Sequence, residues 1–361
     1  MIRCKWLILA VLVSLLVAIV SPPAQSDVPG LNLLIFGQLE LRRAGWSQYR
    51  IASAVTELFT DDLVRGVSGS SARVLCANWQ FQTISPQGTV DMSQVCPAPS
   101  RPVIRRNTGN LIPPRGGTDP LIPFLITPRR TALLDPTPVL RWNRAPNANH
   151  YLVSLRDPSG IIWQQNVEGT ETTYPGTPAL KPAIHYALVI QADTGTSSLD
   201  EEIPGLAFSL LEPEQVQQIE DAIAQLQRES QDEEERLIAQ AYLYRSNNLL
   251  SDAIALLETP TARDSRNPLM HRLLGDLYRQ VRLNLCARNG YERAIALSTA
   301  PESLEELAQA QAALGDVFLM LRNREDAIPA FRQARLAYAT LEGENSDRVR
   351  QLDEQLTELA P

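Results

Sequence analysis

The sequence predicts a multidomain protein in which β structure is followed by α structure. Three observations predict this order. Short alternating strand patterns between glycine and proline turns fill the first half of the chain, prolines crowd one segment among them, and apolar residues at helical spacing fill the C-terminal part. The 361 residues are 44% hydrophobic and 20% charged. This balance is typical of globular domains and excludes a disordered, collagen-like or multi-span membrane chain.

Residues 1–26 are predicted to be an export signal. Arg3 and Lys5 precede an apolar run from Leu7 to Val20, and the small residues Ala24-Gln25-Ser26 follow. This order is typical of a bacterial signal peptide that is cleaved before Asp27. A retained anchor is the alternative, although a membrane span needs about 20 apolar residues, and only that alternative implies membrane contact. We therefore expect an exported protein of the periplasm or cell envelope.

Residues 27–96 are predicted to form a small β domain. Leu39-Glu40-Leu41-Arg42 alternates apolar and polar residues, as a half-buried strand does. Cys76 and Cys96 flank a turn-rich stretch, and in an oxidising compartment we expect a disulfide between them. Two free thiols or a metal site are the alternatives, but no Cys or His nearby completes a zinc site.

Three segments of this domain resemble a known family. Gly37 to Trp46, Asp61 to Arg65 and Ser71 to Cys76 together are similar to the periplasmic FecR-type β domain. The resemblance covers about 65 residues and implies a small β fold outside the cytoplasm.

Residues 97–128 are predicted to be an extended linker. Eight prolines in this range prevent regular hydrogen bonding and favour a semi-rigid spacer. Arg101, Arg105, Arg106 and Arg115 make the segment basic. They allow two interpretations, contact with an acidic cell-envelope polymer or simple solvation. We expect no nucleic-acid partner, because the chain is exported.

Residues 129–211 are predicted to form a β sandwich. Turn signals separate five strand candidates, which are Val139 to Trp142, Tyr151 to Arg156, Ile161 to Val167, Ile184 to Ala192 and Leu206 to Leu211. The alternation from Leu180 to Ala192 and the early Trp142 resemble a fibronectin type III or immunoglobulin-like domain. The resemblance implies that the Tyr186 hydroxyl bonds to upstream backbone, as in a tyrosine corner.

Residues 212–361 are predicted to be helical hairpins. Ala241-x-x-Tyr244, Gly275-x-x-Tyr278 and Gly315-x-x-Phe318 place a small residue three positions before an aromatic one. The first two small residues are 34 apart, and Ala253 and Ala327 follow twelve residues after Ala241 and Gly315. These positions resemble tetratricopeptide repeats, in which small residues stand where paired helices touch. The chain ends in a predicted capping helix, Asp347 to Leu359.

The second repeat departs from this spacing. Gly275 to Ala294 spans 19 residues, so we expect its first helix to be longer by about Arg282 to Arg288, with a disordered insert as the alternative. Asn248, Asn289-Gly290 and Asn323 are predicted to mark the turns between paired helices.

A stack of such repeats presents a concave groove lined by the first helix of each hairpin. By repeat position, eight residues are predicted to line it: Ile238, Tyr242, Arg245, Arg272, Asp276, Arg279, Asp316 and Leu319. The arginines could pair with carboxylates of an extended peptide. At each position the alternative is an ordinary core or solvated residue.

The charge distribution differs along the chain. Residues 27–150 hold 13 arginines and 8 acidic residues, whereas residues 200–361 hold 16 arginines and 29 acidic residues. This asymmetry predicts that the two parts have different partners.

No catalytic or phosphate-binding motif occurs, the three histidines are scattered, and Cys286 on a helix fits a small core residue. We therefore expect no enzyme, metal or cofactor. The leading hypothesis is an exported scaffold that binds a protein or peptide in the groove. The alternative is an envelope-polymer-binding module that acts through the β domains and the basic linker.

Overall fold

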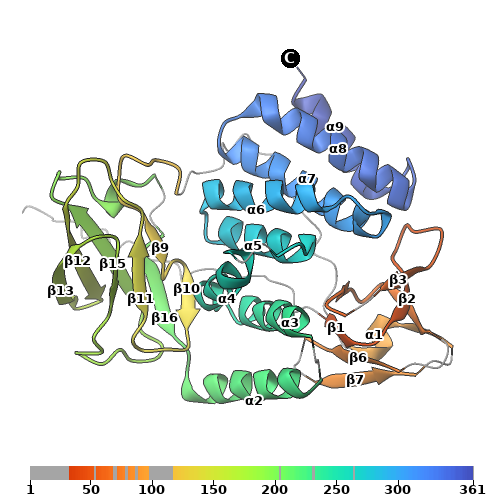
Figure 1. Ribbon diagram of the computed structural model, residues 1–361, viewed down its shortest axis with the longest axis horizontal. Coiled ribbons are helices and arrows are strands. Elements are labelled where there is room, and N and C mark those ends of the chain that lie inside the picture. Colours follow the sequence, from red (N-terminus) through yellow and green to blue (C-terminus); the bar gives the residue numbers. More distant parts are fainter. Residues whose placement is uncertain are drawn as a thin grey trace, which may run out of the picture.

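Two β domains flank a stack of helices in the computed structural model (Figure 1). In this view the N-terminal β domain lies on the right and the second β domain on the left. The structure describes residues 32–360 except 53, 68–70, 78–79, 86–87, 97–116, 203–204, 230–231 and 263–264. The predicted signal peptide and most of the predicted linker lie outside the described residues. The predicted order of β structure before α structure is confirmed.

The N-terminal β domain consists of two four-stranded antiparallel sheets around a small core. The strand orders are β4-β1-β6-β7 and β3-β2-β5-β8. The strands are β1 (Asn32–Phe36), β2 (Leu39–Arg42), β3 (Arg50–Ala52), β4 (Glu57–Leu58), β5 (Leu63–Gly66), β6 (Ala72–Leu75), β7 (Phe81–Ile84) and β8 (Thr89–Asp91). In β2, Leu39 and Leu41 are buried while Glu40 and Arg42 are half-buried, as the alternating pattern predicts.

A disulfide between Cys76 and Cys96 closes this domain, as predicted. Cys76 follows β6, and Cys96 ends the short helix α1 (Met92–Val95). Both cysteines belong to the buried core of the domain. The bond stabilises the domain mainly by restricting the unfolded chain.

The second β domain has a five-stranded and a three-stranded sheet that share one core. Their strand orders are β10-β16-β15-β12-β13 and β14-β11-β9. The strands are β9 (Leu125–Thr127), β10 (Thr131–Leu133), β11 (Val139–Trp142), β12 (His150–Asp157), β13 (Gly160–Glu168), β14 (Glu171–Thr173), β15 (Tyr186–Ala192) and β16 (Ala207–Leu210), with a short 3-10 helix at Ser198–Asp200. All five predicted strands are present. Trp142 of the smaller sheet and Tyr151 of the larger sheet meet edge to face.

Two details of this domain bear on the sequence predictions. The Tyr186 hydroxyl accepts a hydrogen bond from the backbone N–H of Lys181 at 2.7 Å, the bond that the resemblance implied. The predicted linker end at residue 128 is wrong, because β9 pairs with β11 and already belongs to the sheet. Proline content alone did not reveal this strand, since its prolines Pro123 and Pro128 stand just outside it.

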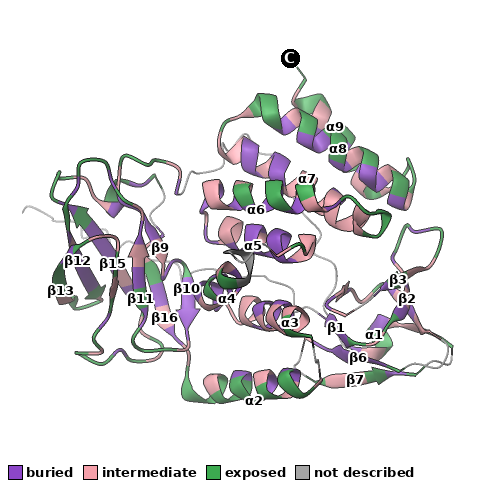
Figure 2. Cartoon of the chain, in the orientation of Figure 1, coloured by how far each residue is buried: buried purple, intermediate pink, exposed green. Residues whose placement is uncertain are grey.

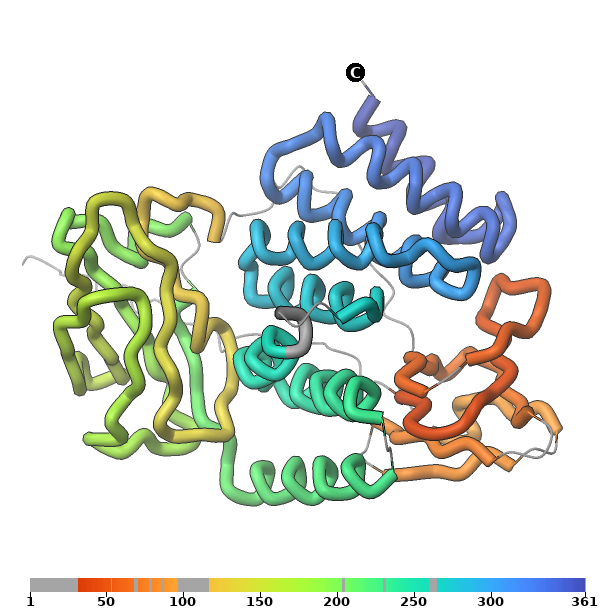
Figure 3. The backbone as a smooth tube through the Cα atoms, in the orientation of Figure 1, coloured from red at the N-terminus to blue at the C-terminus, as the bar shows by residue number. Residues whose placement is uncertain are grey.

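The remainder of the described chain is helical. The helices are α2 (Pro213–Glu229), α3 (Glu233–Ser246), α4 (Leu250–Ala262), α5 (Pro268–Gln280), α6 (Asn284–Leu297), α7 (Leu304–Met320), α8 (Arg324–Glu342) and α9 (Asp347–Glu358), with a 3-10 turn at Pro301–Ser303 before α7. Helices α3 to α8 form three antiparallel hairpins, and α9 packs on the last one (Figure 3). Among the described residues, no helix combines the length and apolarity that a membrane crossing requires.

The second hairpin has the same spacing as its neighbours, so the predicted lengthening of its first helix is wrong. Helix α5 ends at Gln280, and α6 begins only four residues later. Three fully buried alanines stand twelve residues after the small residue of each first helix: Ala253, Ala287 and Ala327. The sequence interpretation places Ala294 at the equivalent position, which is wrong because Ala294 lies two helical turns beyond Ala287 on α6. The third hairpin contains the irregularity instead, because α7 starts eleven residues before Gly315.

A left-handed residue ends the first helix of each hairpin. The three residues are Asn248 (φ 60°), Arg282 (φ 63°) and Arg322 (φ 57°). The predicted turn at Asn289-Gly290 is wrong, because both residues lie inside α6. Gly290 has a packing role there: a Cβ on it would lie 2.9 Å from the Cα of Gly275 on α5. Asn323 is the N-cap of α8.

The N-terminal β domain and the helices share one hydrophobic core. Leu33, Ile35 and Val55 belong to the same buried cluster as residues of α3 and α5. Figure 2 shows β1 as buried where it faces the helices. The two parts of the molecule are therefore packed together rather than tethered.

Ion pairs connect the β domains to the acidic helices. In three of them an arginine of a β domain meets a glutamate of a helix or its start: Arg43–Glu305, Arg73–Glu229 and Arg141–Glu258. Part of the charge asymmetry is therefore used in contacts within the chain, and the different partners of the two parts stay a prediction.

Candidate peptide-binding groove

The first helices α3, α5 and α7 present one face to the N-terminal β domain. Six of the eight predicted groove residues interact there in one charged cluster: Tyr242, Arg245, Arg272, Asp276, Arg279 and Asp316. These residues come from three hairpins, and their equivalent repeat positions place them on one side of the stack, while binding of a peptide by them stays a prediction.

Arg272 on α5 lies at the centre of the cluster and is only 5% exposed. Its Nη1 donates to Oδ2 of Asp276 at 2.8 Å, and its Nη2 lies 3.5 Å from the Tyr242 hydroxyl. Its Nε donates to Glu306 of α7. A buried guanidinium needs such carboxylates, because an unpaired charge in the interior is costly. Burial raises the pKa of Glu306, although Arg272 opposes the shift.

A second chain of contacts continues from Asp276. The Tyr291 hydroxyl donates to Oδ1 of Asp276 at 2.7 Å and accepts from Nε of Arg279 at 3.1 Å. Burial alone would favour the neutral acid, but the surrounding arginines, Arg272 foremost, lower the pKa of Asp276 below its ordinary value. Asp276 is thus ionised at neutral pH and is held by bonds from Arg272 and Tyr291.

Two predicted groove residues do not join the cluster. Ile238 is fully buried in the core that α3 shares with β1, and Leu319 is half-buried in the core of the third hairpin. For these positions the ordinary core interpretation holds.

The face that carries the cluster is covered by a segment of the chain's own N-terminal domain. Oε1 of Glu57 on β4 lies 3.8 Å from Nη2 of Arg272, and Glu57 also interacts with the Tyr242 hydroxyl. Burial and the nearby Glu57 carboxylate raise the pKa of Tyr242 well above its ordinary value. Two residues earlier, the Val55 side chain is buried against the helices.

Arg43 forms a second ion pair between the two domains, in which the N-terminal β domain supplies the cation and the helices supply the carboxylate. From the end of β2 its Nε lies 2.7 Å from Oε1 of Glu305 on α7. Its Nη1 donates to Asp62 at 2.9 Å, and its Nη2 donates to the Glu57 carbonyl at 3.1 Å. Sequence reasoning missed Arg43 and Glu57, since both lie more than 200 residues before the helical residues with which they form ion pairs. The opposite charges of the two parts were the signal that could have found them.

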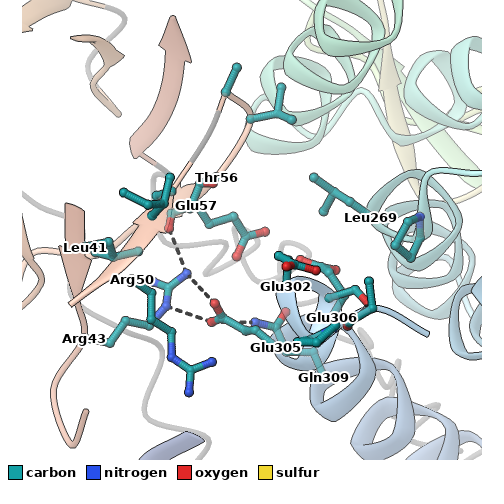
Figure 4. A pocket seen from close by; sticks show the side chains of 18 of the residues that line it. Leu41, Arg43, Arg50, Thr56, Glu57, Leu269, Glu302, Glu305, Glu306 and Gln309 are labelled. Carbon is teal, nitrogen blue, oxygen red and sulfur yellow. Dashed lines mark hydrogen bonds and ion pairs between the residues drawn. The ribbon is translucent and has the colours of Figure 1, made fainter. Parts of the chain in front are cut away.

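A cavity of about 820 Å³ opens beside this contact. One wall is formed by β2, β3 and residues 54–57, and the other by the starts of α5 and α7 (Figure 4). Arg272 lines the cavity together with Glu57, Glu302 and Glu306. Figure 4 shows Arg43 bridging from the β wall to Glu305. The part of the groove left open is therefore a cleft between the two domains.

Cys286 and His271 have different neighbours. Burial raises the pKa of the Cys286 thiol, and its charged neighbours are Glu258 and Arg141. His271 Nε2 lies 2.9 Å from the carbonyl oxygen of Ser265. Cys286 packs against the shared core, as the sequence predicted.

Comparisons with known proteins find similarity in solved structures only. No family model matches the chain, and no curated protein matches it. BtubC (BKLC) from P. vanneervenii is 23% identical over 39% of this chain and 56% of its own, with a TM-score of 0.30. The aligned region thus spans little more than half of BtubC.

Two further structures cover more of their own length. SycD, the type III secretion translocator chaperone of Yersinia enterocolitica, is 15% identical over 38% of this chain and 90% of its own, with a TM-score of 0.32. YrrB, described as a TPR protein with an unusual peptide-binding site, is 16% identical over 41% of this chain and 81% of its own, with a TM-score of 0.24. The repeat geometry described above, rather than these distant similarities, carries the interpretation of the helices.

Proposed function

We propose that this chain is an exported, non-enzymatic scaffold that binds a protein or peptide through the concave face of tetratricopeptide-type repeats. One observation carries the proposal. This face already holds a polypeptide segment, residues 54–58, through apolar contacts of Val55 and the contacts of Glu57 with Arg272 and Tyr242. A surface that holds one extended segment by these contacts has the chemistry to hold another.

The compartment and the types of the two β domains belong to the same proposal. The Cys76–Cys96 disulfide supports an oxidising compartment, in agreement with the signal sequence. The sheet orders and the Tyr186 bond support a fibronectin III type for the second β domain. The FecR-like type of the first domain rests on the sequence resemblance.

A second candidate function is binding of an acidic envelope polymer by the N-terminal β domain. Its support is a stack on β2 and β5 in which the guanidinium carbons of Arg65 and Arg42 lie 4.1 and 5.4 Å from the centre of the Tyr49 ring. Arg65 already pairs with Glu40, and an arginine held on an aromatic face, such as Arg42, can pair with an anionic group. The arginines of the basic linker at residues 101, 105, 106 and 115 lie outside the described residues.

Chemical crosslinking of the full chain in its own envelope tests the leading proposal. We expect wild-type protein to crosslink to a protein partner, and Arg272→Glu to reduce the crosslinked product at least fivefold, because a carboxylate then replaces the cation of the groove. Glu302→Arg is a second groove variant, at the exposed rim of the cavity, and it leaves the buried cluster intact. Its amount of crosslinked product is expected to differ from that of wild type.

Arg156→Glu is the matched control, since Arg156 is exposed on the second β domain. Equal products from the groove variants and this control would contradict the proposal. Binding of purified envelope polymer that is lost in a double Arg42→Ala, Arg65→Ala variant would favour the second candidate.

A further inference from the structure

We propose that residues 54–58 act as a displaceable internal ligand of the helical groove, and that the partner competes with them through an extended acidic segment. The inference rests on the proposed function and adds the chemistry of the partner. Its carboxylate would replace that of Glu57 near Arg272, and an apolar side chain two residues earlier would replace that of Val55.

The backbone of this segment pairs with β1, and Arg43 of the same domain donates to the Glu57 carbonyl at 3.1 Å. Glu57 and Leu58 form β4, an edge strand that pairs with β1. The Val55 N–H donates to the Leu34 carbonyl at 2.6 Å, and the Leu34 N–H donates to the Thr56 carbonyl at 3.0 Å. Residues 54–57 also line the cavity between the two domains, so a competitor can reach the segment from that cavity.

The backbone at Val55 is strained. Its φ is 62°, a left-handed conformation that β-branched residues rarely adopt. Such strain persists only where the surrounding packing imposes it, and here the buried Val55 side chain lies in the core shared with the helices. A partner segment that delivers an apolar side chain with ordinary extended backbone avoids this cost. The strain therefore favours exchange.

The receiving site does not depend on the segment for its shape. Asp276 and Glu306, both on helices, bind Arg272 directly. Glu57 at 3.8 Å is a more distant carboxylate of the group. When Glu57 leaves, Arg272 remains paired and oriented, and no charge is left buried without a partner. A preformed site lowers the cost of binding.

The experiment measures binding of a fluorescent peptide of residues 51–61 to the full chain by anisotropy. We expect weak binding to wild type and at least tenfold tighter binding to Glu57→Lys, because the new cation repels Arg272 and releases the segment. A peptide carrying Glu57→Gln is expected to bind this variant at least fivefold more weakly. Adding Arg272→Gln to the chain is expected to remove the gain.

A second opening variant and a matched control complete the design. Glu305→Lys breaks the contact with Arg43 from the helix side, and the same gain is expected. Glu40→Lys makes an identical charge change on β2, where Glu40 pairs with Arg65 within the N-terminal domain, and wild-type behaviour is expected. Hydrogen exchange in α3 and α5 reports opening directly and is expected to rise in both opening variants only.

The outcomes separate this inference from the proposed function. No gain in either opening variant, or an equal gain in Glu40→Lys, would overturn the inference. An envelope partner whose capture requires Arg272 but is unchanged by Glu57→Lys would leave the proposed function standing and overturn the inference alone. If no envelope protein is captured in a way that depends on Arg272, the proposed function is overturned.

Discussion

At the residue scale, the absence of a side chain at two glycines fixes how closely paired helices approach. A Cβ on Gly315 would lie 2.5 Å from Cε1 of Phe331, and a Cβ on Gly275 would lie 2.8 Å from Cε1 of Tyr291. Both rings are fully buried and cannot move aside freely. The aromatic ring of the second helix occupies the space that the glycine leaves.

Larger residues at these glycines are expected to loosen the stack. Gly275→Leu and Gly315→Leu should each lower the free energy of unfolding by at least about 1–3 kcal/mol, the usual cost of overpacking. Urea denaturation of the full chain measures the loss. Gln333→Ala, at an exposed position of α8, is the control and should leave the midpoint unchanged. Wild-type midpoints in both glycine variants would contradict the helix contact described here.

At the element scale, the start of α4 carries a buried carboxyl group, that of Asp252, whose charged form is disfavoured by burial. Asp252 packs near Leu134 and Asp135 of the second β domain, and its Oδ2 has no hydrogen-bond partner among the described residues. Burial, assisted by the charge of Asp135, raises its pKa from 3.8 to about 7. We therefore expect the contact between α4 and the second β domain to respond to pH.

The sign of this response follows from proton uptake. Between about pH 4 and 7 the folded chain binds a proton at Asp252 that the unfolded chain has released, so stability falls as pH rises through about 7. The slope is at most about 1.4 kcal/mol per pH unit. Urea midpoints at pH 5 and pH 8 measure it, and Asp252→Asn should remove this part of the dependence. An unchanged difference between the two pH values in Asp252→Asn would refute the assignment, with exposed Glu325→Gln as control.

At the scale of the whole molecule, both β domains pack against the helices. The second β domain binds the turns of the first two hairpins, where Ala132 N–H donates to the Asn248 carbonyl at 2.8 Å. Arg129, fully buried, donates through Nε to the Val281 carbonyl at 2.7 Å and forms two bonds of 2.9 Å with Glu201. One arginine thus joins the β domain to the end of α5.

Removal of this arginine is expected to weaken the assembly. Arg129→Ala leaves Glu201 buried without its cation and should cost about 3–5 kcal/mol, which thermal melting of the full chain measures. Arg129→Met together with Glu201→Gln should recover part of the loss, because no unpaired charge remains. Arg144→Ala, outside this contact, should melt as wild type. If Arg129→Ala also melts as wild type, the buried pair does not fasten the domain.

The side of the helical stack on which the candidate residues lie was predictable, because a repeat brings equivalent positions to the same side at a fixed spacing. Tyr242, Arg272 and Asp276 lie on one side of the stack, since equivalent positions of stacked hairpins face the same side, and their role in peptide binding stays a prediction. Repeat spacing gave the wrong residue in the second hairpin. Ala294 and Ala287 are both small and lie on the same face of α6, so the sequence did not show that Ala287 is the equivalent residue. Only the observed end of α5 at Gln280 resolves that ambiguity.

The sequence by itself determined the order of the domains, the pairing of Cys76 with Cys96 and most strands of the second β domain, and its repeat positions placed Tyr242, Arg272 and Asp276 on one side of the helices. Each of these depends on local periodicity or on spacing within one domain. Only the tertiary structure decided that residues 54–58 cover the cluster and that Arg43 reaches Glu305. Contacts between domains depend on complementary shape and charge at surfaces far apart in the chain, and no local pattern specifies which surfaces meet.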